Sequence, residues 1–180
     1  AFIIFLCIVW TNISLRGTTR WKSPVPRAVR IHLYAANIAL GITIIWGAFV
    51  AGLDAGLIYN SYPKMGVQLV PSEIMPTLLT PETYLENRAG VQFFHRWIAA
   101  AALLLILSFW AHGLWRGIRD KSLHILAGLA CFQLILGIYT LLSGLWMPLA
   151  VAHQGGAFLL AATACVISHK AGFTVRSEAN

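Results

Sequence analysis

The sequence predicts an all-α integral membrane protein built around a bundle of four transmembrane helices. Composition is the first reason: 58% of the 180 residues are hydrophobic and only 11% are charged, unlike the mixture typical of soluble domains. The second reason is length, because a helix needs about 20 apolar residues to cross the hydrocarbon core of a bilayer. Four stretches meet this requirement: residues 31–53, 91–112, 123–143 and 148–168.

A shorter apolar run precedes these four stretches. Residues 1–15 are too few to cross a bilayer unaided, so we expect them to be the end of a transmembrane helix that begins outside this sequence. A secretory signal peptide is the alternative. It is disfavoured because no basic residue precedes the run and no clear small-residue cleavage site follows it.

Charge placement predicts the direction of each helix, because short loops rich in Lys and Arg stay on the cytoplasmic or matrix side. The connection at 54–88 holds most of the acidic residues and is expected outside, together with the uncharged turn at 143–147. The basic loop at 16–30, the short loop after residue 112 and the tail at 170–180 are expected inside. Their basic residues are Arg16, Arg20, Lys22, Arg27, Arg30, Arg116, Arg119, Lys121, Lys170 and Arg176. The net charge of +7 therefore reflects topology, and no nucleic-acid partner is expected.

The six histidines fall into two groups by depth. One group lies at inner helix ends, where an imidazole reaches water or headgroups: His32, His112, His124 and His169. His95 and His153 instead lie within apolar stretches, each five residues past the expected outer start of its helix, or about 7 Å deep at ~1.5 Å per residue. Ionisable side chains inside a bilayer are costly and face the bundle interior. This pair is therefore the first candidate for a functional site.

Small neighbours indicate what the two histidines bind. Ala99 lies on the helical face of His95, and Gly156 and Ala157 lie beside His153, which leaves room for a flat apolar group. Axial histidines on facing helices are a common means of holding haem in a bundle. Zinc fits less well, because no carboxylate lies within one turn to complete its ligand set. Helix packing, with each histidine hydrogen-bonded to a neighbouring helix, stays open as the structural alternative.

The cysteines indicate neither a disulfide nor a metal site. Cys7, Cys131 and Cys165 are isolated in apolar segments at no metal-ligand spacing, so we expect them to be small core residues.

Arg96 follows His95 directly and has two possible partners near the outer boundary. It is placed to pair with a haem propionate or with Asp54 at the end of the first long helix. Alternatively, Arg96 reaches the headgroups and Asp54 is solvated. The connection that follows Asp54 contains repeated Gly and Pro, which exclude a continuous helix. Its Tyr59, Tyr62 and Met65 are expected in the membrane interface or over a bound group.

Four motifs in this order resemble haem A synthase. They are residues 47–56 (GAFVAGLDAG) continued by 59–66 (YNSYPKMG), Glu86-Asn87, residues 91–96 (VQFFHR) and Ala152-His153-Gln154. Their spacing is similar to the C-terminal half of that family, in its alphaproteobacterial and mitochondrial branch, from about Arg30 to His169. Gly47 and Gly137 also occupy comparable positions in the first and third long helices, a weak similarity from which no prediction follows.

The resemblance implies a fold and a function. The family is an eight-helix, pseudo-symmetric membrane enzyme that oxidises a methyl group of haem O to the formyl group of haem A, as terminal oxidases require. Its N-terminal half is the substrate half, and its C-terminal half holds haem b. His95 and His153 would then be the axial ligands of haem b. Gln92, Arg96 and Gln154, beside them in the motifs, are further candidate cofactor-binding residues. The catalytic residues would lie in an N-terminal half outside this sequence.

Partners and location follow from the same resemblance. They are haem O as substrate, the N-terminal half, membrane lipid, haem O synthase, and a quinone or other electron acceptor. The membrane would be the bacterial plasma membrane or the mitochondrial inner membrane, with the C-terminus on the cytoplasmic or matrix side. Two other functions stay open: a free-standing bis-histidine cytochrome b that exchanges electrons with a quinone, and a transporter or assembly scaffold without haem.

Overall fold

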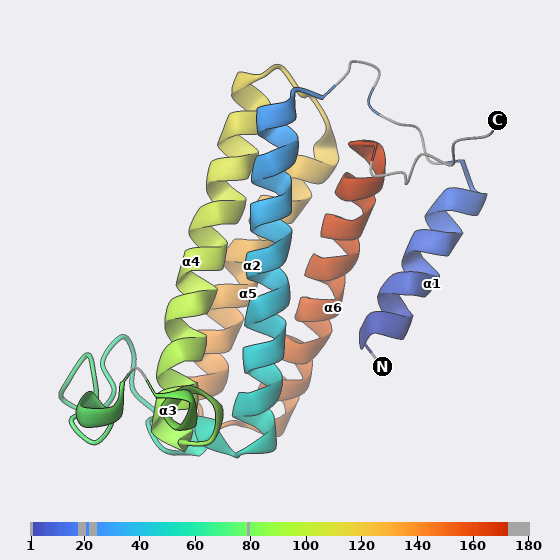
Figure 1. Ribbon diagram of the computed structural model, residues 1–180. Coiled ribbons are helices and arrows are strands. Elements are labelled where there is room, and N and C mark those ends of the chain that lie inside the picture. The colour runs from blue at the N-terminus through green and yellow to red at the C-terminus, as the bar shows by residue number, and fades with distance from the viewer. Residues whose placement is uncertain (1, 18–20, 22–24, 79, 173–180) are drawn as a thin grey trace.

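The computed structural model contains helices and no strand over the residues it describes, which are 2–17, 21, 25–78 and 80–172. Four long antiparallel helices form an upright bundle (Figure 1): α2 (Arg27–Gly52), α4 (Arg88–Trp115), α5 (Lys121–Leu142) and α6 (Met147–Lys170). Each is long and apolar enough to cross a membrane. This confirms the predicted all-α membrane bundle.

Capping residues set the helix ends, which lie up to four residues from the expected positions. α4 begins at Arg88 because the Asn87 side chain accepts hydrogen bonds from the backbone N–H groups of Ala89 and Gly90, at 3.0 and 3.1 Å. Asp120 caps α5 in the same way through the N–H of Ser122, at 2.8 Å. Apolar length thus predicts a span, whereas a polar side chain just outside it fixes where the helix starts.

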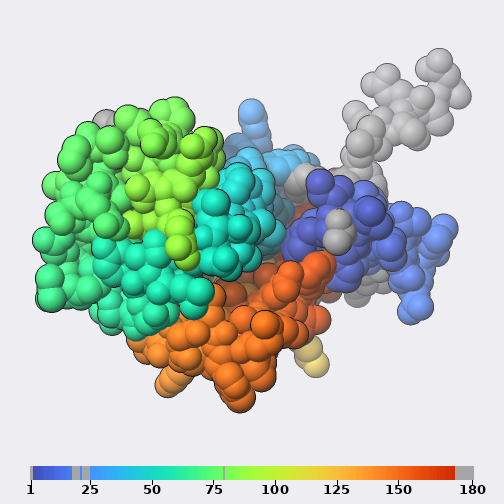
Figure 2. All heavy atoms as spheres, turned by 90° about the horizontal axis from the view of Figure 1, so that it is seen from below, coloured from blue at the N-terminus to red at the C-terminus, as the bar shows by residue number. Residues whose placement is uncertain are grey.

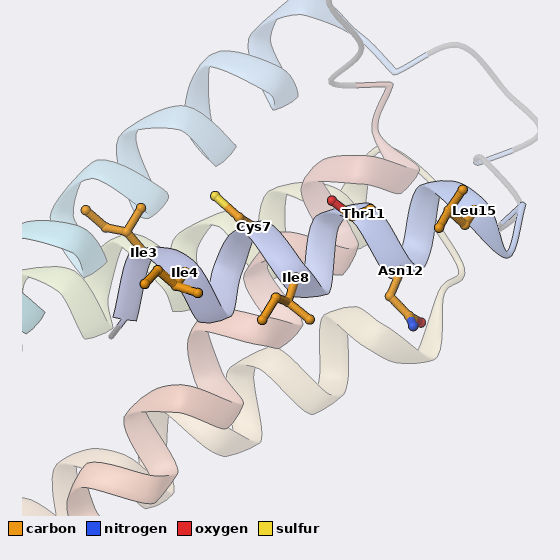
Figure 3. Close-up of a pocket in the computed structure, with 7 residues that line it drawn as sticks. All are labelled: Ile3, Ile4, Cys7, Ile8, Thr11, Asn12 and Leu15. Atoms are coloured by element: carbon orange, nitrogen blue, oxygen red, sulfur yellow. The ribbon is translucent and has the colours of Figure 1, made fainter.

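A shorter helix, α1 (Phe2–Leu15), lies beside α6 (Figure 1). The rings of Phe2 and Phe5 meet Phe158 of α6 at centroid distances of 4.6 and 5.0 Å. The other face of α1 is an open, mostly apolar hollow (Figure 3), lined by Ile3, Ile4, Cys7, Ile8, Thr11, Asn12 and Leu15. Cys7 is exposed there, and Cys131 and Cys165 are only half-buried, so the cysteines are not the core residues we expected, although all three are free thiols.

The long helices associate as two antiparallel pairs. α2 packs mainly on α4 and α5 mainly on α6, α4 joins the pairs through α5, and α2 touches α6 only sparsely. We call the end that carries residues 54–87 the outer end and the opposite end the inner end, after the predicted orientation. Several residues behind that orientation lie outside the described part of the chain: Arg20, Lys22, Arg176 and Glu178.

Residues 54–87 form the outer segment, which contains short helical turns at η1 (Ala55–Leu57), η2 (Met75–Thr77) and α3 (Pro81–Leu85). This agrees with the expectation that Gly and Pro exclude a continuous helix. Seen from the outer end (Figure 2), the outer segment gathers on the side of α2 and α4, whereas α5 and α6 lie on the other side.

The packed core occupies the inner half of the bundle. We call this core the inner layer; its buried residues are Val29, Leu33, Ala36, Leu40, Ile106, Phe109, Leu123, Leu126, Ala130, Leu160, Ala161, Ala164, Ile167 and Ala171. All four long helices contribute to it, as in a soluble helix bundle.

The inner end is closed by polar contacts. Asp120, between α4 and α5, accepts hydrogen bonds from Lys170 Nζ at 2.9 and 3.0 Å and from Trp21 Nε1 at 2.8 Å. The Trp21 N–H also donates to the Lys170 carbonyl at 3.1 Å. The carboxylate of Asp120 therefore joins three separate segments of the chain.

The inner histidines are less solvated than expected. His32 Nδ1 lies 3.2 Å from His112 Nδ1, and His32 Nε2 lies 3.0 Å from the Ser108 hydroxyl, so these side chains link α2 to α4. His169 is buried, with its Nε2 3.4 Å from Ser14 of α1. His124 is exposed and accepts a hydrogen bond from Trp110. The prediction of water-facing imidazoles was wrong for His169, because α1 covers it.

Candidate functional site

His95 of α4 and His153 of α6 lie at similar depth on helices that belong to different pairs. Each lies about two turns from the outer start of its helix, and the two rings are close enough for their charges to interact. Both rings are half-buried, yet both Nδ1 atoms are fully buried. The structure therefore brings together the two histidines that the sequence singled out.

The side chains around these rings are less buried than those of the inner layer. Among the described residues, no side chain is buried in α2 beyond Leu40, in α4 between Gln92 and Ala102, in α5 between Ala130 and Thr140, or in α6 before Leu160. We call this level the histidine layer. A tightly packed interior would bury residues from every helix, so the histidine layer is packed less tightly than the inner layer over two to three turns of each helix.

A glycine on the paired helix lies against each histidine ring. A Cβ atom added at Gly47 of α2 would stand 3.3 Å from His95 Cε1, and one added at Gly137 of α5 would stand 2.8 Å from His153 Cε1. A backbone carbonyl also lies beside each ring, that of Thr43 near His95 and that of Gln133 near His153. Neither Nδ1 makes a hydrogen bond of good geometry to another described residue.

These features fit a flat group held through two imidazoles. The histidine layer carries two imidazoles from different helix pairs among partly buried side chains, and a backbone carbonyl beside each ring is a group of the kind that orients metal-ligating histidines. A cluster of three or more His, Cys, Asp or Glu side chains that could hold a bare metal ion is absent from the described residues. The donor set therefore fits haem iron and does not fit a structural zinc site.

Arg96 and Gln92 bind the outer segment. Arg96 donates from Nη1 to the Ser61 carbonyl at 2.7 Å and to the Lys64 carbonyl at 3.3 Å, and from Nη2 to the Tyr59 carbonyl at 2.8 Å. Gln92 donates to the Tyr59 carbonyl at 3.0 Å. The motif residues at 59–66 are thus hydrogen-bonded to α4 at Gln92, about one turn before His95, and at Arg96, directly after it.

Asp54 is not the partner of Arg96. Asp54 is exposed, and its backbone carbonyl accepts a hydrogen bond from Arg88 at 2.7 Å. Nor does Arg96 extend to the headgroups, because its guanidinium is occupied by backbone carbonyls of the outer segment. The exposed Asp54 agrees with the expectation that it is solvated, whereas the expected contacts of Arg96 with Asp54 and with the headgroups were both wrong, because the outer segment folds back over α4 in a long-range contact that residue spacing does not reveal.

Further contacts stiffen the outer segment. Asn60 donates to the carbonyls of Gly56 and of Leu141 in α5, at 3.1 and 3.0 Å. The Tyr59 hydroxyl donates to Glu73 at 3.1 Å. Burial, together with the hydrogen bond to Glu73 and its negative charge, raises the pKa of Tyr59. The Met65 side chain is buried. Tyr59 and Met65 therefore serve the internal structure of the outer segment.

Gln133 belongs to the site, and the sequence analysis overlooked it. Its Nε2 donates to the His153 carbonyl at 2.6 Å, and its Oε1 is buried against Gly156. An amide in the middle of an apolar membrane-spanning stretch is costly unless it has a partner. That cost is the signal by which Gln133 could have been found from the sequence. Gln154, by contrast, is exposed on α6.

Comparison with known proteins identifies the family. Residues 1–165 match the COX15-CtaA family, described as cytochrome oxidase assembly protein. The chain is 42% identical to Heme A synthase of Rhodospirillum centenum over 163 residues, 89% of this chain and 44% of that protein. It is 35% identical to Heme A synthase COX15 of Bos taurus over 169 residues, 91% of this chain and 41% of that protein.

The match covers less than half the length of each of these two relatives. No solved structure matches the chain. The family match extends over nearly all of the sequence and includes every motif discussed above, so the chain belongs to the COX15-CtaA family of cytochrome oxidase assembly proteins.

Proposed function

We propose that this chain is the C-terminal, haem b-binding half of a haem A synthase, with His95 and His153 as the two axial ligands of the haem iron. The observation that carries the proposal is the histidine layer, where two imidazoles on different helix pairs lie at the same depth among side chains that are only partly buried. The relatives named Heme A synthase support the same assignment.

The whole enzyme would oxidise the methyl group of haem O to the formyl group of haem A for oxidase assembly. Haem b, when bound here, supplies one-electron transfer. His95 and His153 would hold the haem iron through two imidazoles, a ligand set that would suit electron transfer and disfavour oxygen binding. The residues that act on haem O would lie in the N-terminal half, and the electrons would pass to a quinone or another acceptor.

The remaining residues of the site would orient the two histidines and shield the histidine layer from water. Arg96 and Gln92 hold the outer segment across the outer end of α4 and so limit the access of water to the histidine layer. Gln133 ties α5 to the backbone of His153 and fixes the height of that ligand. Arg96 and Gln92 would thus support cofactor binding through the outer segment, without direct contact with the haem.

The membrane would be the bacterial plasma membrane or the mitochondrial inner membrane, with the C-terminus on the cytoplasmic or matrix side. Basic residues described at the inner end, such as Arg27 and Arg30, support this orientation. Cysteine labelling tests it: a reagent that cannot cross membranes should modify a cysteine placed at exposed Val67 and spare one placed at exposed Arg116 in intact cells.

Absorption spectroscopy of the purified chain in detergent tests the haem assignment. We expect the oxidised and dithionite-reduced spectra of a six-coordinate, low-spin b-type haem. The substitutions His95→Ala and His153→Ala should each remove one ligand and convert or abolish this spectrum, whereas His124→Ala, at the exposed inner end, should preserve it. A wild-type protein without a haem spectrum, or a His153→Ala protein with an unchanged one, would contradict the proposal.

A further inference from the structure

We propose that Gly47 and Gly137 are positioning residues that seat the rings of His95 and His153 and turn both toward the histidine layer. This inference rests on the proposed function, because it concerns the orientation of the proposed haem ligands. It adds two residues, on α2 and α5, that touch neither the iron nor its ligand nitrogens but determine where those nitrogens point.

Each glycine leaves space that the neighbouring histidine ring occupies. A Cβ atom at Gly137 would lie 2.8 Å from His153 Cε1 and 3.4 Å from both ring nitrogens. Carbon atoms in folded proteins essentially never approach to 2.8 Å without a bond, so any side chain here displaces the ring. At Gly47 the added Cβ would lie 3.3 Å from His95 Cε1, and a shift of a few tenths of an ångström relieves the contact.

A backbone carbonyl also lies beside each histidine ring. The carbonyl near His95 belongs to Thr43 and the carbonyl near His153 belongs to Gln133. Each residue precedes its glycine by four positions, so the carbonyl and the glycine share one face of the helix, one turn apart. A ring that rests on the glycine therefore also lies beside that carbonyl, and the two groups together restrict how the ring can turn.

The arrangement around the histidine occurs twice in the bundle. The same set of a glycine, a carbonyl four residues earlier and a histidine from the partner helix occurs in the α2/α4 pair and again in the α5/α6 pair. Other glycines of these helices do not share it: Gly41 in α2 and Gly128 in α5 have no atom within 4 Å of an added Cβ. Within α2 and α5, the close contact is therefore specific to the two glycines that face histidines.

Alanine substitutions with matched controls test the positioning role of Gly47 and Gly137. The full chain carrying Gly137→Ala, Gly47→Ala, Gly128→Ala or Gly41→Ala is purified, its fold is checked by circular dichroism, and its haem is examined by titration and electron paramagnetic resonance. Gly137→Ala should weaken haem binding by about 10- to 100-fold, the usual loss when a group that orients a metal ligand is removed, and should replace the low-spin signal with a high-spin one.

The substitutions at the two glycines should differ in the size of their effect on the haem. Gly47→Ala should retain haem but shift the low-spin g-values and the reduction potential, because its ring is displaced only slightly. Gly128→Ala and Gly41→Ala should match the wild type. If Gly137→Ala does not fold, Gly47→Ala against Gly41→Ala carries the test through the g-values and the potential.

The outcomes separate this inference from the proposed function. The wild-type chain could bind low-spin haem while Gly137→Ala and Gly47→Ala fold and give identical spectra. This result would overturn the positioning role of the two glycines and leave the ligand assignment standing. A wild-type chain that binds no haem would overturn both.

Discussion

Arg96 stands next to a proposed haem ligand, yet its guanidinium group is directed at the backbone of the outer segment. It reaches the carbonyls of Tyr59, Ser61 and Lys64 at once. A planar guanidinium presents five N–H donors in a fixed fork, whereas a lysine ammonium presents three donors on a flexible stem. Arginine at this position therefore fixes several backbone groups that lysine would release.

Replacing Arg96 with Lys tests this role. The variant keeps the charge but should lose most of the carbonyl contacts, and hydrogen-deuterium exchange at residues 59–66 should quicken by about 5- to 30-fold, as expected for 1–2 kcal/mol of lost local stability. Arg88→Lys is the control, since exposed Arg88 makes a single hydrogen bond to Asp54. Equal exchange at residues 59–66 in Arg96→Lys and wild type would argue against the role.

Asp120 links stability to pH at the inner end. Partial burial alone would raise the pKa of this carboxyl group, but hydrogen bonds from Ser122, Lys170 and Trp21 outweigh burial and hold the pKa well below its ordinary range. The folded state therefore binds the proton more weakly than the unfolded state. The stabilisation is complete at neutral pH and is lost as pH falls below about 4, the ordinary carboxyl pKa.

Thermal unfolding at a series of pH values measures this contribution. Asp120→Asn should melt at a lower temperature than wild type at pH 7, and the gap should narrow as the pH falls below about 4. Trp21→Phe, which removes one hydrogen bond to the carboxylate, should give a smaller deficit at pH 7. A constant gap between Asp120→Asn and wild type from pH 7 to pH 3 would refute the linkage.

At the scale of elements, the crossing of α3 over the start of α4 depends on Gly90. A Cβ atom at Gly90 would overlap the carbonyl of Thr83, which is buried in α3. Neither the carbonyl nor the first turn of α4, held by its Asn87 cap, has room to yield. The glycine therefore allows the outer segment to dock closely on the helix that carries His95.

Glycine substitutions in two long helices should have opposite signs. Gly41→Ala, with open space around it, should stabilise the protein by about 0.4–1 kcal/mol by restricting the unfolded chain. Gly90→Ala should destabilise it by about 1–3 kcal/mol through overpacking. Unfolding in detergent, with proteolysis of the outer segment as a second measurement, distinguishes them. Equal stability of the two variants would disprove the close crossing.

Much of the helical framework could be predicted from the sequence, for reasons visible in particular elements. The apolar stretches fix four spans, and the depth of His95 and His153 follows from counting residues along a helix. The contacts around them could not be predicted, because they depend on which helices pair and at what height. The approach of Gly47 to His95 and the fastening of Arg96 to residues 59–66 both require segments distant in sequence.

At the scale of the whole molecule, the bundle is divided into a packed inner layer and a histidine layer whose side chains are only partly buried. The inner layer supplies the buried apolar surface that stabilises the fold. The histidine layer lacks such burial. A group bound between the rings would supply the missing contacts, so cofactor binding and stability are expected to be strongly linked in this protein.

Haem loading should therefore raise stability in a specific pattern. With free haem at 100 times its dissociation constant, unfolding should cost about 2.7 kcal/mol more than for the protein without haem. Exchange protection should rise at the level of His95 and His153 and change little in the inner layer. The double variant His95→Ala/His153→Ala should show no gain. Protection that rises evenly along all helices, or persists in the double variant, would contradict the division into layers.

The position of the filled inner layer also has an electrical consequence. It separates the histidines from the inner end by about half the bundle, while only about two turns of helix separate them from the outer end. Moving one charge across an entire membrane takes about 2.3 kcal/mol per 100 mV of membrane potential. With haem bound as proposed, an electron that reached it from the outer end would cross a small fraction of that potential, so its transfer would depend little on the size of the membrane potential.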